Sequence, residues 1–529
     1  MLRIILTHQN ATPWVEQAGI SVKGFILAAD GSLLKEQNLA AYFGQCRNES
    51  ELKALLRESN GMFSVVIKRD HGWIAAVDRA RSFPLFYRKT KDGWDVSDEV
   101  DALFSPGESK MINQKSACVF RFTGYTISNT TLLEGVYQVQ PGEMVCRGDE
   151  QSENLFYFRF AKKETTVSYE EAKQQLSDIL QRVGKRLVTS LEGRPVAVPL
   201  SGGLDSRLIV YLLHQQQYKN VTCFTYGKRQ HNHELSRSQR VAEHFGYPWL
   251  LVDYQQLGQC NLSKDSDFQS YSHYAFQYSA KCYLSEYLAA VYLRNQQILS
   301  HDTVVLPGHS GDTIGGSHVR PYMLNYRSDK QVIKDLIYNH FNLFETHGSD
   351  RCEITRQLND LFRQSEYRDL SYAEKMKAWV LRERHGKYIV NSCRLWEYMG
   401  CSFLLPLWDS ELVDFFAALP IKFRLHKKLY EEVLWELFEK EGILYEEDRK
   451  SVIADGVKER LKLFVKRNMM FIQPRKELFA NDPIGFQYLL QGFQQELSQK
   501  PSKWKAKSFN AFLTEWYLSH LEQEVTAQK

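Results

Sequence analysis

The stretch 199–206, Pro-Leu-Ser-Gly-Gly-Leu-Asp-Ser, limits the possible folds of this chain more than any other feature. The short apolar segment 195–198 before it predicts a buried strand, and the apolar spacing over 207–216 predicts a helix. A strand that breaks at Ser-Gly-Gly and continues as a helix leaves free backbone N–H groups at the positive end of the helix dipole. Gly202 and Gly203 remove the Cβ atoms that would keep an anion from the backbone. The stretch therefore predicts a phosphate-binding turn in an α/β fold.

The side chains of this stretch indicate which phosphate compound binds. Its serines supply hydroxyl donors and its aspartate can hold the Mg²⁺ that accompanies a nucleotide. The Gly-Lys-Ser/Thr ending of the Walker loop is missing, and the motif instead resembles the pyrophosphate-binding loop of the ATP pyrophosphatases. We therefore expect ATP and Mg²⁺, the alternative being a plain glycine turn in a Rossmann-like sheet. The expected ATP-binding residues are Leu200, Ser201, Gly202, Gly203, Asp205 and Ser206.

Length, charge and cysteine usage narrow the class of protein. A chain of 529 residues is too long for one core, so two or three domains are expected. The net charge of +4 gives no reason to expect nucleic acid, and no apolar run is long enough to span a bilayer. The first eight residues form a strand pattern instead of a signal peptide. Nine scattered cysteines, none at C-x-x-C spacing, predict reduced thiols in a cytoplasmic protein.

Residues 1–160 are predicted to form a β-rich domain. Strand patterns at 63–67 and 72–77 flank a turn-prone segment. They are followed by Asp-Arg, then Pro-Leu-Phe-Tyr and Val-Ser, within 78–97. This order resembles the glutaminase domain of asparagine synthetases, which belongs to the N-terminal-nucleophile (Ntn) hydrolase class. The resemblance implies a β-sandwich.

The chain differs from the glutaminase domain at the position of the catalytic nucleophile. The family attacks glutamine with a cysteine that becomes the N-terminal residue, whereas this chain has Leu2 there and its first cysteine is Cys46. A thiol inside the chain cannot be activated by its own terminal amine. Asn60 and Gly61 fit the family's pattern but also suit a turn before a strand. We therefore expect a degenerate domain without glutaminase activity, a scaffold or a substrate-positioning cap.

Residues 165–529 are predicted to form the second domain, after a polar boundary. A helix over 169–188 leads to the 195–206 strand and loop, and strands at 221–227 and 248–252 continue the alternation. Strands that alternate with helices imply a parallel sheet with ligands at the carboxyl ends of its strands. In the asparagine synthetases the end of the second strand contacts adenine. The resemblance thus implies adenine contacts from Phe224, Tyr226 and Gly227, although Phe224 equally suits the core.

A second glycine-rich turn, Pro-Gly-His-Ser-Gly-Asp-Thr-Ile-Gly-Gly at 307–316, follows a strand. It is similar to the family's Gly-Glu-Gly-x-Asp-Glu-x-x-Gly-Gly motif, one residue shorter, which makes Gly308 an ATP-binding candidate and Asp312 a magnesium ligand. Asp205 and Asp312 on neighbouring strand ends would suit a cation that bridges phosphates. His309 stands where the synthetases carry Glu, and a neutral imidazole can take a proton from an amine. The alternative is that His309 only shapes the ligand site or is merely tolerated.

Residues 322–415 are predicted to be helical. Within them, 394–409 resembles a synthetase segment whose Glu and Arg help form the acid-substrate pocket; Phe403 and Leu405 replace them here. The resemblance therefore implies an acid other than aspartate. Asp409 persists, and we expect it to cap a helix.

Two lysines match positions of cations in the family. Lys450 corresponds to the lysine that reaches the α-phosphate, where a fixed cation stabilises developing charge, and Lys428 corresponds to an earlier helix-starting lysine. Both are catalytic candidates by resemblance, and solvated surface lysines are the alternative.

Taken along its length, the chain is similar to the group of asparagine synthetases, β-lactam synthetases and lasso-peptide cyclases. The group's C-terminal fold is a parallel-sheet ATP-pyrophosphatase (adenine nucleotide α-hydrolase-like) domain with many helices. The resemblance implies a ligase that activates a substrate carboxylate as an acyl-adenylate and transfers it to an amine donor, without glutamine. Candidate acids are sugar acids of surface polysaccharides and peptide or amino-acid derivatives. A nucleotide-binding scaffold and a tRNA-modifying ATP pyrophosphatase are the rival functions, and the oligomeric state stays open, a homodimer included.

Overall fold

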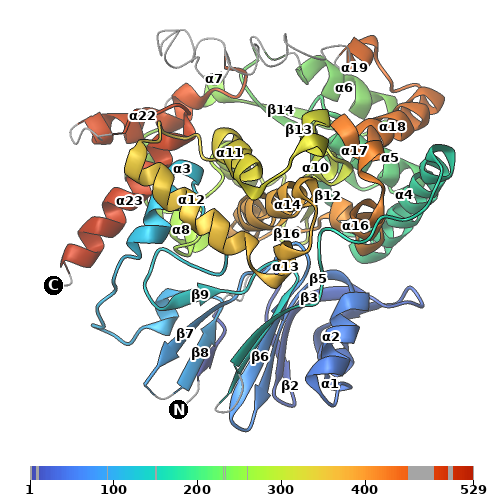
Figure 1. Ribbon diagram of the computed structural model, residues 1–529. Helices are drawn as coiled ribbons and strands as arrows, with labels where there is room; N and C mark the ends of the chain where they lie inside the picture. Colours follow the sequence, from blue (N-terminus) through green and yellow to red (C-terminus); the bar gives the residue numbers. More distant parts are fainter. Residues whose placement is uncertain are drawn as a thin grey trace.

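The computed structural model has a β-rich N-terminal part beneath a larger, mainly helical C-terminal part (Figure 1). It describes residues 3–7, 11–91, 93–148, 152–229, 232, 234–258, 260–450, 482–498 and 504–527. The predicted fold class, a β-rich N-terminal region followed by a parallel-sheet region, is confirmed. The domain boundaries at 160 and 165 stay a prediction; the last N-terminal strand ends at Phe156 and the following helix begins at Tyr169.

Two sheets form the N-terminal part. One has the order β11-β10-β6-β5-β3-β2 with β4 beside β3, and the other has the order β1-β8-β7-β9. Val66, Trp73 and Tyr87 pack between the sheets, whereas Val65 and Ile67 join the core on the opposite face, so side chains alternate with the period of two that a strand imposes. The strands are β1 Ile4–Ile5, β2 Val15–Gln17, β3 Ile20–Leu27, β4 Leu33–Lys35, β5 Asn60–Arg69, β6 Gly72–Val77, β7 Phe86–Thr90, β8 Gly93–Ser97, β9 Val136–Gln138, β10 Glu143–Gly148 and β11 Ser152–Phe156.

A five-stranded parallel sheet, in the order β14-β13-β12-β15-β16, forms the centre of the C-terminal part. Its strands are β12 Val196–Pro199, β13 Val221–Gly227, β14 Trp249–Asp253, β15 Val304–Val305 and β16 Ser402–Phe403. The strands predicted from the alternating pattern are confirmed. The region 322–415 is mainly helical, as predicted, but it also contains the edge strand β16, which the prediction missed because two residues that pair with β15 are too short to leave a periodic signal.

Helices surround this sheet (Figure 1). The α-helices are α1 Glu36–Gly44, α2 Glu49–Glu58, α3 Gln114–Thr123, α4 Tyr169–Leu191, α5 Leu204–Gln215, α6 Glu234–His244, α7 Tyr254–Leu257, α8 Ser266–Phe276, α9 Tyr287–Asn295, α10 Gly311–Gly315, α11 Asp329–His340, α12 Gly348–Phe362, α13 Ser365–Arg368, α14 Tyr372–Trp379, α15 Arg394–Tyr398, α16 Ser410–Ala418, α17 Ile421–Arg424, α18 Lys428–Glu441, α19 Glu446–Lys450, α22 Phe486–Ser498 and α23 Asn510–Ala527. A π-helix, η4 Val380–Ile389, continues α14, and short 3₁₀ turns include η3 Pro321–Asn325.

Local sequence explains where two of these helices begin. Ser168 caps α4 by accepting from the Glu171 N–H, and the Glu171 side chain binds back, which forms a capping box. The predicted cap at Asp409 is confirmed, because its carboxylate accepts from the N–H groups of Glu411 and Leu412 at the start of α16. No helix among the described residues is long and apolar enough to cross a membrane.

Candidate active site

A cavity of about 460 Å³ lies at the carboxyl ends of β12, β13 and β15. The 199–206 loop and the 307–312 turn both line it. The two meet at Gly308, where a Cβ would lie 2.6 Å from the Ser206 nitrogen, so only glycine allows the turn to lie this close to the start of α5. The sheet thus brings together two motifs that lie a hundred residues apart in the sequence.

The 199–206 loop presents backbone N–H groups to this cavity. The Ser206 hydroxyl accepts from the Ser201 N–H at 3.0 Å, which folds the loop over the first turn of α5. The Gly202 N–H donates to Glu234 Oε2 at 3.4 Å, so an anionic oxygen already lies on the loop. Glu234 had no motif to mark it in the sequence. The geometry is that of an anion-binding helix start.

Two carboxylates face each other on this loop and the neighbouring turn. The Asp312 N–H and the Tyr430 hydroxyl donate to Asp205 at 2.8 and 2.9 Å. Desolvation at the cavity wall, reinforced by the Asp312 carboxylate, raises the pKa of Asp205 to about 7. Paired carboxylates of this kind fit a Mg²⁺ ion that takes its remaining ligands from phosphates and water. No cluster of three or more potential metal ligands occurs among the described residues.

Lysines of the 427–450 region are placed differently from the sequence match. Lys427 lines the cavity and lies within electrostatic reach of Asp205 and Asp312. Lys428, the predicted candidate, points to the surface: its side chain is 62% exposed and it lies 3.7 Å from Glu432. Lys427 has a positive φ of 57° just before α18, so its side chain leaves the backbone in a different direction from that of Lys428. The side chain of Lys450, at the end of α19, lies outside the described residues.

His309 and Glu286 form a polar pair on the opposite wall. His309 Nε2 lies 3.9 Å from Glu286 Oε1, and its Nδ1 lies 3.4 Å from the Ser392 hydroxyl. Burial lowers the pKa of His309 to about 4 and raises the pKa of Glu286 to about 7. Glu286 Oε2 is buried without a hydrogen-bond partner in the described part of the chain. A neutral imidazole beside a carboxyl that titrates near neutrality can accept a proton from a ligand.

The adenine candidates differ in how they reach the cavity. Phe224 and Tyr226 line it, but the Phe224 ring is 1% exposed and packs edge-on against Trp396, so its side chain also belongs to the core. The Tyr226 hydroxyl donates to Glu286 Oε1 at 3.4 Å, which links the strand end to the His309 pair. Gly227 lies against the Pro483 carbonyl and is outside the cavity lining.

A buried ion pair holds the 199–206 loop against α19. The Arg207 guanidinium donates to both carboxylate oxygens of Asp448, at 2.6 and 3.2 Å, and to the Gly202 carbonyl at 3.1 Å. The two side chains are 1% and 4% exposed. Because α19 ends at Lys450, this pair fixes the distance between the loop and the helix that carries that lysine.

The N-terminal residues that fit the glutaminase pattern are used inside the protein. Asn60 donates to Asp409 Oδ2 and accepts from the Ser410 N–H, both at 2.9 Å, so it joins β5 to α16. The Asp78 carboxylate accepts from the N–H groups of Phe63, Ala80 and Ser82. The cavity beside them is only about 60 Å³.

Comparisons with known proteins point to one family. The model of the asparagine synthase family matches residues 177–466, more than half of the chain, and no curated protein sequence matches. Glutamine phosphoribosylpyrophosphate amidotransferase from B. subtilis matches with 13% identity and a TM-score of 0.19, over 46% of this chain and 73% of its own. NH3-dependent NAD synthetase from Campylobacter jejuni matches with 14% identity and a TM-score of 0.19, over 37% and 96%. The U34-tRNA thiolase of Methanococcus maripaludis matches with 15% identity and a TM-score of 0.18, over 39% and 70%. Scores this low add nothing to the family match.

Proposed function

Because this chain belongs to the asparagine synthase family, a class of ATP-dependent, amide-forming ligases, we propose that it adenylates a carboxylic acid other than aspartate and transfers the acyl group to an amine. The observation that carries the proposal is the convergence of four features on one cavity. These are the 199–206 loop, the Asp205–Asp312 pair, Lys427 and the Glu286–His309 pair.

The first half-reaction uses the loop side of the cavity. A substrate carboxylate oxygen attacks the α-phosphorus of ATP, the bond to the β-phosphate oxygen breaks, and pyrophosphate leaves. The N–H groups of 201–203, which here donate to the side chains of Ser206, Glu234 and Ser201, would exchange these acceptors for the departing pyrophosphate. Asp205 and Asp312 would hold its Mg²⁺. Lys427 stabilises the charge that builds on the phosphates, and Lys450 is proposed for the α-phosphate.

The second half-reaction uses the opposite wall. The amine attacks the acyl carbon, the bond to AMP breaks, and the nitrogen loses a proton. Glu286, whose pKa lies near 7, holds that proton better than His309, whose pKa lies near 4. His309 then serves as the neutral hydrogen-bonding partner that orients the amine toward Glu286.

Two observations support the proposal that the acid is not aspartate and that the nitrogen does not come from glutamine. Phe403 and Leu405 are buried apolar side chains where the synthetases use Glu and Arg, and they offer no charge to an aspartate. In the N-terminal part, burial raises the pKa of Cys118 to about 11 and that of Cys146 to about 12, which makes poor nucleophiles. The pKa of Cys46 is raised as well. Sugar acids and peptide or amino-acid derivatives are the proposed acids.

The test follows oxygen from the acid into AMP. The protein is incubated with ATP, Mg²⁺, ammonia and candidate acids labelled with ¹⁸O in the carboxylate, and AMP is analysed by mass spectrometry. One ¹⁸O per AMP is expected, because the acid's oxygen bridges to the α-phosphorus and leaves with AMP. ADP instead of AMP, unlabelled AMP, or amide formed only with glutamine would contradict the proposal.

A further inference from the structure

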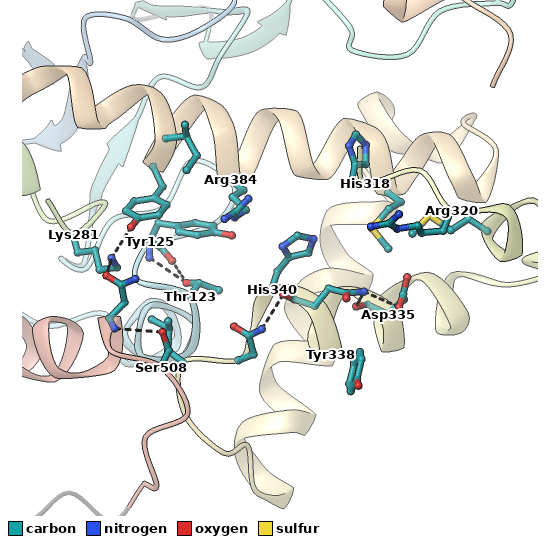
Figure 2. A pocket seen from close by; sticks show the side chains of 18 of the residues that line it. Thr123, Tyr125, Lys281, His318, Arg320, Asp335, Tyr338, His340, Arg384 and Ser508 are labelled. Atoms are coloured by element: carbon teal, nitrogen blue, oxygen red, sulfur yellow. Dashed lines mark hydrogen bonds between the residues drawn. The ribbon is translucent and has the colours of Figure 1, made fainter. Parts of the chain in front are cut away.

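A second and larger cavity, of about 1140 Å³, adjoins the nucleotide cavity. Tyr283 lines both, with its ring 6.5 Å from that of His309 on one side and 6.0 Å from that of Tyr388 on the other. Residues of α11, of the π-helix η4 and of the segments just after α3 and just before α23 form the walls (Figure 2). Because the two cavities share this wall residue, the larger one lies beside the cavity proposed for ATP.

The charges on these walls are predominantly positive. Lys281, Arg320 and Arg384 line the cavity, against the single acid Asp335. That acid is already occupied, since its carboxylate accepts from the hydroxyls of Tyr322 and Tyr326 and from the Asn339 amide. The lining therefore has more basic side chains than acidic ones.

Two of the wall side chains have no protein partner. Arg384 is half-buried and makes no hydrogen bond or ion pair with any residue that the structure describes. Both ring nitrogens of His318 are buried and also have no hydrogen-bond partner there. Burial, with Lys377 and Arg424 nearby, lowers the pKa of His318 to about 3, so the ring is neutral and can donate one hydrogen bond. Leaving buried polar atoms such as the His318 nitrogens unpaired is costly, and Arg384 lines the same cavity without an anionic partner, which indicates that a ligand satisfies both.

Lys281 adds a third group without a carboxylate partner. It is 1% exposed, and its ammonium donates to the Tyr388 hydroxyl at 2.7 Å and to the Asn510 side-chain oxygen at 2.8 Å. Burial lowers its pKa to about 7. An anion beside Lys281 would favour its charged form.

The volume of the cavity and the basic side chains of its lining argue against a single amino acid or an amine as its ligand. Ligand pockets of roughly 300–1,000 Å³ hold drug-sized molecules, so this cavity is too large for a single amino acid. An amine reaches the protein as an ammonium ion and would be repelled by the wall cations. The exposed rings of Tyr322 and Tyr338 lie at its edge and offer apolar faces to an extended ligand.

We propose that this cavity binds the acid substrate, and that the substrate carries a second anionic group, a phosphate or another carboxylate, held by Arg384 and His318. The inference rests on the proposed function, because it takes the reacting carboxylate to point through Tyr283 toward the nucleotide. Arg384 is thereby the residue that selects dianionic over monoanionic acids.

The test compares acids that differ by one anionic group. Binding to the full chain, with Mg²⁺ and a non-hydrolysable ATP analogue, is measured by calorimetry for two matched pairs. One pair is glucuronic acid and glucuronic acid 1-phosphate, and the other is acetyl-Gly-Ala and acetyl-Asp-Ala. At least about tenfold tighter binding of the acid with the second anionic group is expected in one pair or both, since a charge-assisted hydrogen bond to the half-buried Arg384 guanidinium contributes roughly that factor. The pair that responds identifies a saccharide or a peptide source.

Variants separate recognition from folding. Arg384→Gln should reduce the preference to less than twofold, Arg384→Lys should retain part of it, and Arg368→Gln, which changes an exposed arginine of α13, should retain all of it. Equal affinities within both pairs, or a preference that survives Arg384→Gln, would overturn the proposal. Dianion binding without ¹⁸O transfer to AMP would refute the adenylation proposal alone. Adenylation of monoanions with no dianion preference would refute this inference alone.

Discussion

Asp78 of the N-terminal sandwich and Asp205 of the parallel sheet are both acids with a raised pKa, to about 6 and about 7, yet their surroundings differ. Asp78 is 2% exposed, and three backbone N–H groups, two from its own turn and one from β5, satisfy its carboxylate. Asp205 faces a cavity of about 460 Å³ and a second carboxylate. One acid stabilises a turn, and the other is available to a ligand.

The contrast extends to the two regions as a whole. The polar residues that fit the glutaminase pattern are joined to α16 around a cavity of about 60 Å³. The strand ends of the parallel sheet instead open on the cavity that Glu286 lines, and His318 lines the larger cavity beside it. Both side chains have buried polar atoms without a hydrogen-bond partner among the described residues. Asn60 and the Asp78 carboxylate are satisfied by the protein itself, as in a scaffold, whereas the unpartnered atoms of Glu286 and His318 lie beside cavities that a ligand can enter.

The largest expected effect comes from the buried ion pair behind the loop. Arg207→Met should lower the free energy of unfolding by up to about 3–5 kcal/mol, because the buried Asp448 would lose its bidentate partner and keep the more distant Arg237, 3.5 Å away. Denaturant unfolding measures it. Arg182→Met is the matched control, since its pair with Glu411 is 47% and 37% exposed and should contribute less than about 1 kcal/mol. Equal losses in the two variants would show that the loop does not depend on the buried pair.

A smaller effect, on the rate of amide formation, is expected from a change at Glu286. At a fixed concentration of uncharged amine, the wild-type rate of amide formation should rise with pH through about 7, because the carboxylate that accepts the amine's proton forms above the raised pKa. Glu286→Gln should lower the rate about 10²-fold and abolish this rise. Single-turnover kinetics after adenylate formation report it.

The control for Glu286 is an exposed acid of α4. Glu170, whose side chain is 82% exposed, can be changed to Gln without touching the cavity. A pH profile unchanged by Glu286→Gln would assign proton transfer to another group, His309 included.

The smallest effect is expected in the N-terminal region. Asn60→Ala removes the hydrogen bonds to Asp409 and Ser410 and should lower the free energy of unfolding by about 1–3 kcal/mol, with kcat/KM for ammonia-dependent amide formation unchanged. Unfolding and steady-state assays on one preparation test both parts. A loss of amide formation without a loss of stability would give this region a catalytic role and remove the contrast.

Features carried by one continuous stretch could be predicted from the sequence. The strand, loop and helix over 195–216 and the cap at Asp409 follow from local apolar spacing and side-chain chemistry. Features that depend on one backbone dihedral angle could not be predicted from the sequence. Lys427 and Lys428 are indistinguishable until the positive φ at Lys427 sends one into the cavity and the other to the surface.

Features assembled from distant segments were also out of reach. Glu286 has no motif around it and meets His309 only through the sheet. The cations of the larger cavity come from segments near 281, 320 and 384, and no periodicity relates these positions. Their common location is a property of the packing of η3, η4 and α11.

The most direct test of the account is ATP–pyrophosphate exchange by the wild type, Asp205→Asn and Asp369→Asn, the last changing an acid that is 70% exposed. If the parallel-sheet cavity carries out adenylation, exchange should depend on a carboxylic acid, fall about 10²–10³-fold in Asp205→Asn and stay unchanged in Asp369→Asn. Exchange that Asp205→Asn leaves intact, or that no acid stimulates, would contradict the assignment of adenylation to this cavity.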